Sequence, residues 1–246
     1  MKITRTTHRS RCSSVHTAIL IVLASTGAAV AQPLTDSTHD FSGVQGQHNW
    51  YYGIYDAGHA QQVSPIDFQL LPSYAIGINA GDGYWHGPEG PGGYFTLIRA
   101  TRVHPNGWIT TGDRAAQDQW AVRRWVAPAT GSIRVVAKFT DLNTLCGNGV
   151  LAHIYQGNTE IWTRVIDSID GQTFEADIAV STGMNLDFAV DPFDSWDGCD
   201  NTGSIITIRG PIVQHPVNAR TCPGGVATFS VAATSACDIS YQWRYN

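Results

Sequence analysis

Lysine is almost absent from this 246-residue sequence, with only Lys2 and Lys138, and charged residues of all kinds make up 14%. Helical bundles need runs of strong helix formers, and nucleic-acid-binding proteins need clustered basic residues, so both classes are disfavoured. The 25 glycines and 11 prolines favour a chain rich in turns. A hydrophobic fraction of 43% is enough for a sizeable core.

Sequence motifs of the common enzyme classes are also missing. There is no G-x-S-x-G elbow, no H-E-x-x-H, no P-loop and no G-x-G-x-x-G. Glycoside hydrolysis needs two facing carboxylates, but the only glutamates are Glu89, Glu160 and Glu175. Glu160 follows a turn and Glu175 lies on the outward side of a predicted strand, so neither indicates a cleft. Catalysis is therefore the less favoured interpretation.

The first 31 residues have the pattern of a secretory leader. Four basic residues precede an apolar run at 18–24, and the small residues Ala29 and Ala31 occupy the positions that signal peptidase reads. The run is too short and too rich in Ser, Thr and Gly for a comfortable membrane span. We expect cleavage before Gln32 and a secreted or cell-surface protein with no membrane insertion afterwards.

Removal of this leader takes away four of the 15 basic residues and none of the 20 acidic ones. The remaining chain is strongly acidic, so it repels nucleic-acid phosphates and anionic membranes. Neutral glycans, divalent cations and other surface proteins are the partners that this charge allows.

Four cysteines follow the leader, which in an exported protein favours disulfides. Cys146 and Cys199 each lie in a loop-like stretch, and we predict that they pair. Cys222 and Cys237 are separated by a predicted strand about 20 Å long, whereas bridged cysteines need Cα atoms within about 7 Å. We expect these two to pair with partners outside this chain unless the segment folds back.

Short segments of alternating hydrophobic and polar residues recur between residues 50 and 210, separated by Gly, Pro, Asn and Asp. Residues 132–139 place four hydrophobic side chains on one face, and residues 173–180 do the same. Period-two patterning between turn signals predicts antiparallel strands. Further candidate strands are 50–55, 94–98, 120–126, 149–155, 161–165, 186–190 and 204–209. The fold class is therefore all-β, an antiparallel sandwich.

After Gly210 the pattern changes, and residues 212–216 (IVQHP), 224–232 (GGVATFSVA) and 241–244 (YQWR) follow. Their order resembles the first third of an immunoglobulin-like domain from bacterial surface proteins. The resemblance implies that 227–232 is strand B and that Trp243 is the core tryptophan of strand C. Phe229 and Val231 stand where antibody domains have a strand-B cysteine. A full domain needs about 100 residues, so 211–246 would be a partial domain with strands A to C only, within a larger modular chain.

Residues 41–210 resemble the jelly-roll modules of large secreted bacterial proteins, which are similar in outline to carbohydrate-binding modules. The segments that carry this resemblance are 40–53, 104–105, 121–125 and 186–192 (LDFAVDP). It implies a jelly-roll sandwich and an extracellular location, with no fixed ligand or catalytic set. We accordingly predict a leader at 1–31, a linker at 32–40, a jelly roll at 41–210 and a partial immunoglobulin-like domain at 211–246.

The glycine-rich stretch 81–90 (GDGYWHGPEG) is the best candidate for ligand binding. Tyr84 and Trp85 could stack on a pyranose ring while His86 and Glu89 bond to its hydroxyl groups. The alternative is that Trp85 closes the end of the sandwich, because a long loop must itself be held in place.

Two further clusters stand out. On a strand, Trp120 and Arg124 share one face while Arg123 and Trp125 share the other, which favours core packing with an arginine reaching out to solvent.

Aspartates recur every three residues in the stretch 191–200. Calcium prefers such oxygen ligands, and the jelly-roll resemblance makes a structural calcium a candidate cofactor; a solvated acidic loop is the alternative. The proposed calcium ligands are Asp191, Asp194, Asp197 and Asp200.

These observations favour a non-catalytic surface or adhesion protein that recognises a glycan or another surface protein. A carbohydrate-active enzyme and a purely structural spacer are the alternatives.

Overall fold

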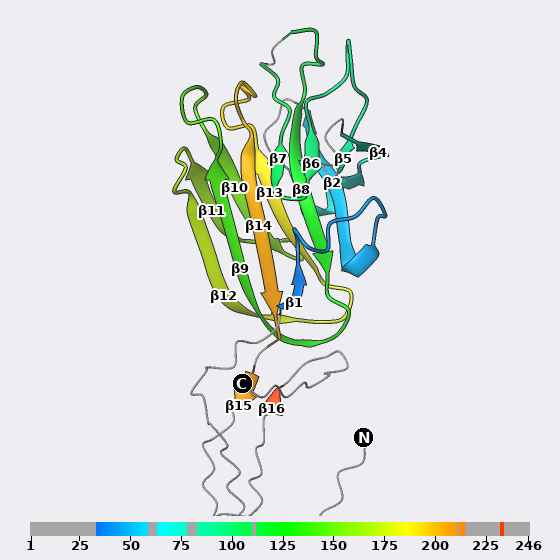
Figure 1. The fold of residues 1–246 in the computed structure, drawn as a ribbon, viewed down its shortest axis with the longest axis vertical. Coiled ribbons are helices and arrows are strands. Elements are labelled where there is room, and N and C mark those ends of the chain that lie inside the picture. The colour runs from blue at the N-terminus through cyan, green and yellow to red at the C-terminus, as the bar shows by residue number, and fades with distance from the viewer. Residues whose placement is uncertain are drawn as a thin grey trace, which may run out of the picture.

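A computed structural model describes residues 33–58, 63–77, 83–109 and 112–210, together with the backbone of 212–214 and 232–233. In this part of the chain the regular structure is almost wholly strand, which confirms the all-β prediction (Figure 1). The helices here are two single turns, η1 (Gln47–Asn49) and η2 (Pro65–Asp67), and no described helix is long and apolar enough to cross a membrane. The predicted leader, Cys222, Cys237 and Trp243 lie outside the described residues.

The larger sheet has eight strands. Its order is β12 (Gln172–Val180), β9 (Gly131–Asp141), β14 (Thr202–Arg209), β7 (Arg102–His104), β6 (Leu97–Arg99), β5 (Gly83–His86) and β4 (Ser73–Ile76), with β1 (Pro33–Asp36) also paired to β14. The smaller sheet has six strands in the order β11 (Thr159–Ile166), β10 (Val150–Gln156), β13 (Asn185–Asp191), β8 (Asp118–Val126), β2 (Trp50–Gly58) and β3 (Phe68–Leu70). Every pair of strands in both sheets is antiparallel, as in a jelly-roll sandwich.

Short strands also pair in the C-terminal segment, where β15 (Ile212–Gln214) lies antiparallel to β16 (Ala232–Ala233). Whether an immunoglobulin-like domain begins here stays a prediction.

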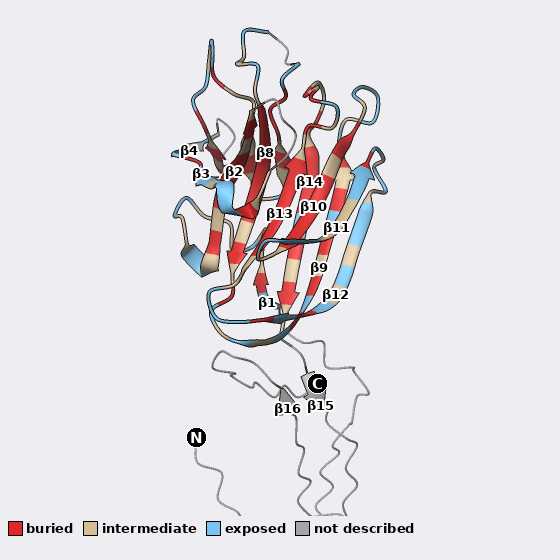
Figure 2. Cartoon of the chain, turned by 180° about the vertical axis from the view of Figure 1, so that it is seen from behind, coloured by how far each residue is buried: buried red, intermediate tan, exposed pale blue. Residues whose placement is uncertain are grey.

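The core lies between the two sheets and follows the alternation that the sequence predicts. On β9, Ile133, Val135, Ala137 and Phe139 are all buried, and on β13, Leu186, Phe188 and Val190 are buried. The edge strand β12 keeps alternate residues exposed along its length (Figure 2). Burial of the inner face of both sheets supplies the main stabilising term of the sandwich.

Three strand predictions need correction. Residues 33–36, expected as part of a linker, form β1 and pair with β14. Residues 83–86, expected as part of a loop, form β5 between β4 and β6. Residues 94–98 were expected to form one strand, but only Leu97 and Ile98 do so, because β6 begins at Leu97. In each case a strand of three or four residues is too short to leave a clear alternating pattern.

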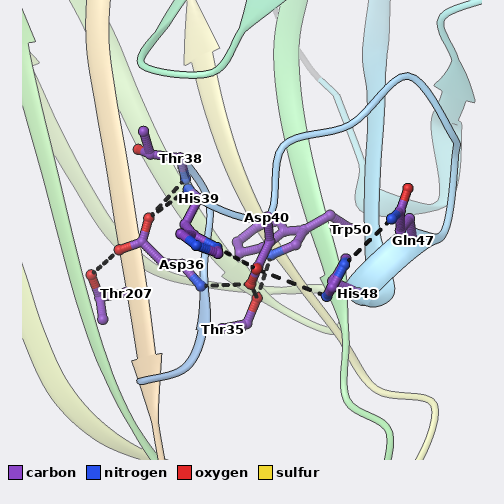
Figure 3. A network of polar contacts seen from close by, with 9 residues as sticks. All are labelled: Thr35, Asp36, Thr38, His39, Asp40, Gln47, His48, Trp50 and Thr207. Carbon is purple, nitrogen blue, oxygen red and sulfur yellow. Dashed lines mark hydrogen bonds and ion pairs between the residues drawn. The ribbon is translucent and has the colours of Figure 1, made fainter. Parts of the chain in front are cut away.

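A polar network fixes β1 and the turn after it (Figure 3). The Asp40 carboxylate accepts hydrogen bonds from Thr35 Oγ1 at 2.6 Å and from the Asp36 amide at 2.9 Å. Trp50 Nε1 donates to Thr35 Oγ1 at 2.7 Å, and Thr207 on β14 donates to Asp36 at 3.1 Å. Thr207 belongs to β14 in the eight-stranded sheet, and Trp50 belongs to β2 in the six-stranded sheet. These hydrogen bonds therefore tie the start of the described chain to both sheets.

The same network places histidine nitrogens near Asp40, with His39 Nδ1 at 3.3 Å and His48 Nδ1 at 3.8 Å from its Oδ1 (Figure 3). Burial acts to raise the pKa of Asp40, but the hydrogen bonds from Thr35, Asp36 and His39, with the charge of His48, outweigh it and lower the pKa. Asp40 is therefore an ionised anchor of the N-terminal turn.

Candidate functional site

Strand β5 divides the glycine-rich segment into an inward and an outward side. Trp85 faces the core and is 6% exposed. Its ring stacks on Tyr52 with centroids 5.9 Å apart, and its Nε1 donates to the carbonyl of Ser42 at 2.8 Å. Contrary to the prediction, Trp85 therefore offers no face for stacking a sugar; its packing role is the one that the structure supports. Pleating explains the error, because alternate residues of a strand point to opposite faces.

Close packing around Trp85 also explains a glycine in this strand. The rings of Tyr74 and Trp85 lie 5.3 Å apart. A Cβ on Gly83 would lie 1.9 Å from the Tyr74 hydroxyl oxygen. A side chain at this position would therefore have to displace the Tyr74 ring.

The outward side of β5 carries the other predicted residues. We call Tyr84, His86, Glu89 and Arg99 the β5 patch. The rings of Tyr84 and His86 lie 5.1 Å apart, and the Arg99 guanidinium carbon lies 4.4 Å from the centre of the Tyr84 ring. His86 Nδ1 lies 3.5 Å from Glu89 Oε1, whose side chain is 48% exposed. The β5 patch thus joins aromatic surface to a carboxylate acceptor and to the guanidinium of Arg99, a cationic donor.

A second cluster, which the sequence did not single out as a site, lies on the outer face of the six-stranded sheet. The predicted division of β8 is confirmed: Trp120 and Val122 face outward, and Ala121 and Trp125 face the core. The outer cluster consists of Tyr55, Ala57, Trp120, Val122, Tyr155 and Ala189. All of its members are buried, with Val63 and Phe68 packed against them, so this sheet has a covered outer face.

Asp187 is the polar centre of that face. It is fully buried and accepts two hydrogen bonds from Arg124, each 2.7 Å long, one from the Tyr55 hydroxyl at 2.5 Å and one from Asn185 at 3.0 Å. Burial, and then the charge of Asp187, raises the pKa of Tyr55 and keeps its hydroxyl as a donor. Arg124 lies on the adjacent strand β8 and Tyr55 on β2, the strand beyond it, so this network ties three strands of the sheet together.

His153 extends the same face toward β11. Its ring stacks on Trp120 with centroids 4.5 Å apart. Its Nδ1 lies 2.5 Å from Glu160 Oε1, and its Nε2 lies 3.7 Å from Asp191 Oδ2. Because His153 is buried, this group has the character of packed structure with a polar rim, not of an open catalytic cleft.

Arg123 departs from the expected arginine that reaches solvent, because it is fully buried between the sheets. Its Nη2 donates to the carbonyls of Arg99 and Ala100, while Nε and Nη1 have no hydrogen-bond partner. Burial lowers the pKa of Arg123 to about 10. Arg124 is the arginine that follows the expected arrangement, since it is partly exposed and lies over the Phe68 ring.

The predicted disulfide between Cys146 and Cys199 is formed, with Cα atoms 5.9 Å apart. It joins the β9–β10 loop (142–149) to the β13–β14 loop (192–201), which lie at the same end of the sandwich (Figure 1). The Leu142 amide also donates to the Asn201 carbonyl at 3.0 Å. These two loops therefore form one pinned unit.

The four aspartates proposed as calcium ligands do not share one environment. Asp194 is exposed, and Asp191 is directed toward His153. Asp197 and Asp200 are almost fully buried. Burial, and then the charges of Asp197, Asp141 and Asp191, raises the pKa of Asp200 to about 8. Among the described residues, no three His, Cys, Asp or Glu side chains form a ready-made metal site.

Comparison with known proteins gives little additional information. No family model matches the chain, and no curated protein matches it. Solved structures similar to it include a carbohydrate-binding module from Cellvibrio mixtus lichenase 5A in complex with cellotriose, with 12% identity over 64% of this chain and 96% of that one, at a TM-score of 0.27. A family 35 module from Clostridium thermocellum has 12% identity over 56% of this chain and 98% of its own, at 0.28. A family 35 module from Paenibacillus barcinonensis has 13% identity over 64% and 98%, at 0.25. At TM-scores this low, the assignment of the fold rests on the strands themselves.

Proposed function

We propose that this protein is an exported, non-catalytic glycan-binding module and that the β5 patch binds the sugar. The observation that carries the proposal is the outward pair Tyr84 and His86 on β5, next to the half-exposed carboxylate of Glu89. A pyranose has apolar C–H faces and a rim of hydroxyl groups, so it needs an aromatic surface bordered by donors and acceptors.

Each member of the patch has a distinct role in this proposal. Tyr84 supplies the aromatic surface, Glu89 accepts hydrogen bonds from hydroxyl groups, and Arg99 donates them. His86 Nδ1 donates to the Gly87 carbonyl at 2.7 Å, which leaves Nε2 as an acceptor for a hydroxyl group. The acidic balance of the chain after the leader disfavours polyanionic ligands, so neutral polysaccharides are the preferred class.

Export is supported by two features of the chain. The leader pattern at 1–31 is typical of secreted proteins, and the Cys146–Cys199 disulfide belongs to an oxidising compartment. An extracellular polysaccharide is the ligand class that this location makes accessible.

Affinity electrophoresis and calorimetry with a panel of neutral plant and microbial polysaccharides test the proposal. Tyr84→Ala is expected to abolish binding, and Glu89→Gln to weaken it, with circular dichroism unchanged. Tyr51→Ala is the matched control, because Tyr51 is a partly exposed aromatic residue on β2 in the other sheet. Binding that survives Tyr84→Ala would refute the β5 patch as the site.

The same samples test the alternatives. Release of reducing ends or unsaturated products by the wild-type protein, lost in Glu89→Gln, would identify a carbohydrate-active enzyme instead. Absence of both binding and product release would favour a structural spacer, or recognition of another surface protein.

A further inference from the structure

Arg123 carries a buried charge for which the described residues supply no opposite charge. Its side chain is fully buried between the sheets, and burial lowers its pKa to about 10, so it stays protonated at neutral pH. Among the described residues, the titratable group whose charge acts on Arg123 is Tyr52, and no carboxylate pairs with it. Buried charges are normally paired, because an unpaired charge in the core is costly. Arg123 therefore needs an anion that this part of the chain does not provide.

The hydrogen bonds of Arg123 leave part of its guanidinium unused. Nη2 donates to the carbonyls of Arg99 and Ala100, in the turn between β6 and β7. These carbonyls satisfy Nη2 but do not neutralise the charge. Nε and Nη1 are buried and have no hydrogen-bond partner. Because buried polar groups nearly always have a partner, these N–H groups indicate that an acceptor belongs beside them.

Tyr52 provides a second unused donor next to Arg123. The two residues are register partners on the adjacent strands β2 and β8, and both are fully buried. Phe41 contacts both of them, since its ring centre lies 4.9 Å from that of Tyr52 and 5.8 Å from the Arg123 guanidinium carbon. The Tyr52 hydroxyl is buried and has no partner, and burial raises the pKa of Tyr52 to about 12, so the hydroxyl keeps its proton. The charge of Arg123 acts on this hydroxyl, so the two donors face the same part of the core.

We propose that a chloride ion binds between the two sheets, held by an unpartnered N–H group of Arg123 and by the hydroxyl of Tyr52. A monovalent anion fits because one charge neutralises one guanidinium, whereas sulfate or phosphate would bring a second, unpaired charge into the core. The rings of Phe41 and Trp85 pack on Tyr52 and give the site apolar walls, which strengthen the attraction between the ion and the guanidinium.

The position of the site gives the anion both a route and a structural role. The β6–β7 turn, whose carbonyls accept from Arg123, reaches the surface at Thr101. Opening of this turn lets solvent anions exchange with the site. Arg123 belongs to the six-stranded sheet and the turn to the eight-stranded sheet. A bound chloride therefore stabilises a contact that joins the two sheets.

Thermal unfolding in mixtures of sodium chloride and sodium gluconate, at constant ionic strength, tests the proposal, because gluconate is too large to enter the core. We expect a Tm rise that is half complete at about 10 mM chloride and reaches about 5 °C at about 200 mM. Arg123→Met should remove this dependence, and Tyr52→Phe should raise the half-saturating chloride concentration several-fold. Arg134→Met is the matched control, because Arg134 is an exposed arginine of β9 and its loss should leave the dependence unchanged.

Crystals grown in sodium bromide add a readout of position, because bromide replaces chloride and scatters X-rays anomalously. One anomalous peak per chain is expected within hydrogen-bond distance of both Arg123 and Tyr52. A water molecule in that place, with no anomalous peak, would overturn the proposal.

The unfolding data can also contradict the proposal. Equal Tm values for the wild type in chloride and in gluconate would show that no chloride is bound. A chloride dependence that persists in Arg123→Met would show a general effect of salt instead of a site. If Arg123→Met does not fold, Tyr52→Phe decides, because it keeps the ring and removes only the hydroxyl; an unchanged half-saturating concentration would then refute the site. The glycan assays vary other residues, so either proposal can fail alone.

Discussion

Replacement of both Cys146 and Cys199 by serine should cost this fold a large part of its stability. The disulfide closes a loop with a sequence separation of 53 residues, and the chain-entropy model assigns such a loop about 4 kcal/mol. Cys146 is exposed and Cys199 is partly exposed, so little packing is lost with the sulfur atoms. Most of the effect therefore comes from the greater freedom of the unfolded chain.

Equilibrium unfolding in urea measures this loss. With a slope of about 2 kcal/mol/M, the midpoint should fall by about 2 M. Leu145→Ser is the matched control, because Leu145 is a fully exposed residue of the same loop and should leave the midpoint unchanged. A double variant that unfolds at the wild-type urea concentration would refute the argument that this bridge constrains the unfolded chain.

Three further predictions concern single side chains. Trp85→Ala should lower the free energy of unfolding by about 3–5 kcal/mol, as expected for a buried aromatic residue, while Trp85→Phe should cost less; thermal unfolding measures both. Asp187→Ala should cost about 3–5 kcal/mol in urea unfolding because it removes the fully buried partner of both Arg124 and the buried Tyr55 hydroxyl, whereas Asp177→Ala, at an exposed ion pair, should have no measurable effect. The stability that ionised Asp40 contributes should be complete above the unfolded-state pKa of about 3.8 and be lost as pH falls through its lower folded-state pKa. The difference in stability between wild type and Asp40→Asn should therefore be fully present at pH 5 and shrink below pH 4.

Each of these has an outcome that would contradict it. An unchanged Tm in Trp85→Ala would mean that the ring is not part of the core. Equal costs for the Asp187 and Asp177 substitutions would show that the Asp187 network adds no more than a surface pair. A difference between wild type and Asp40→Asn that persists at pH 2 would show that ionisation of Asp40 is not its cause.

Period-two alternation was sufficient to predict the long strands and their inward faces. On β9 it separates buried Ile133 and Val135 from exposed Ser132 and Arg134. It failed on the six-stranded sheet, where Asp187 occupies an outward position and is nevertheless fully buried. Alternation assigns a residue to a face but does not show whether that face is covered. The Asp187 network was missed for this reason.

The candidate sites show the same limit at the level of single residues. Tyr84, Trp85 and His86 were grouped because they are adjacent in sequence, but a strand sends Trp85 to the core and its two neighbours to the surface. A four-residue strand among glycines leaves no alternating signal from which this separation could be predicted.

The aspartates of 191–200 were grouped by a three-residue spacing, which has no structural meaning outside a helix. What distinguishes Asp197 and Asp200 from Asp194 is burial at a pinned loop junction. That junction depends on a disulfide partner 53 residues away. The disulfide could be predicted from the sequence, and it would have been the better guide: residues that flank both cysteines, and not residues at equal spacing along one loop, are those brought together in space.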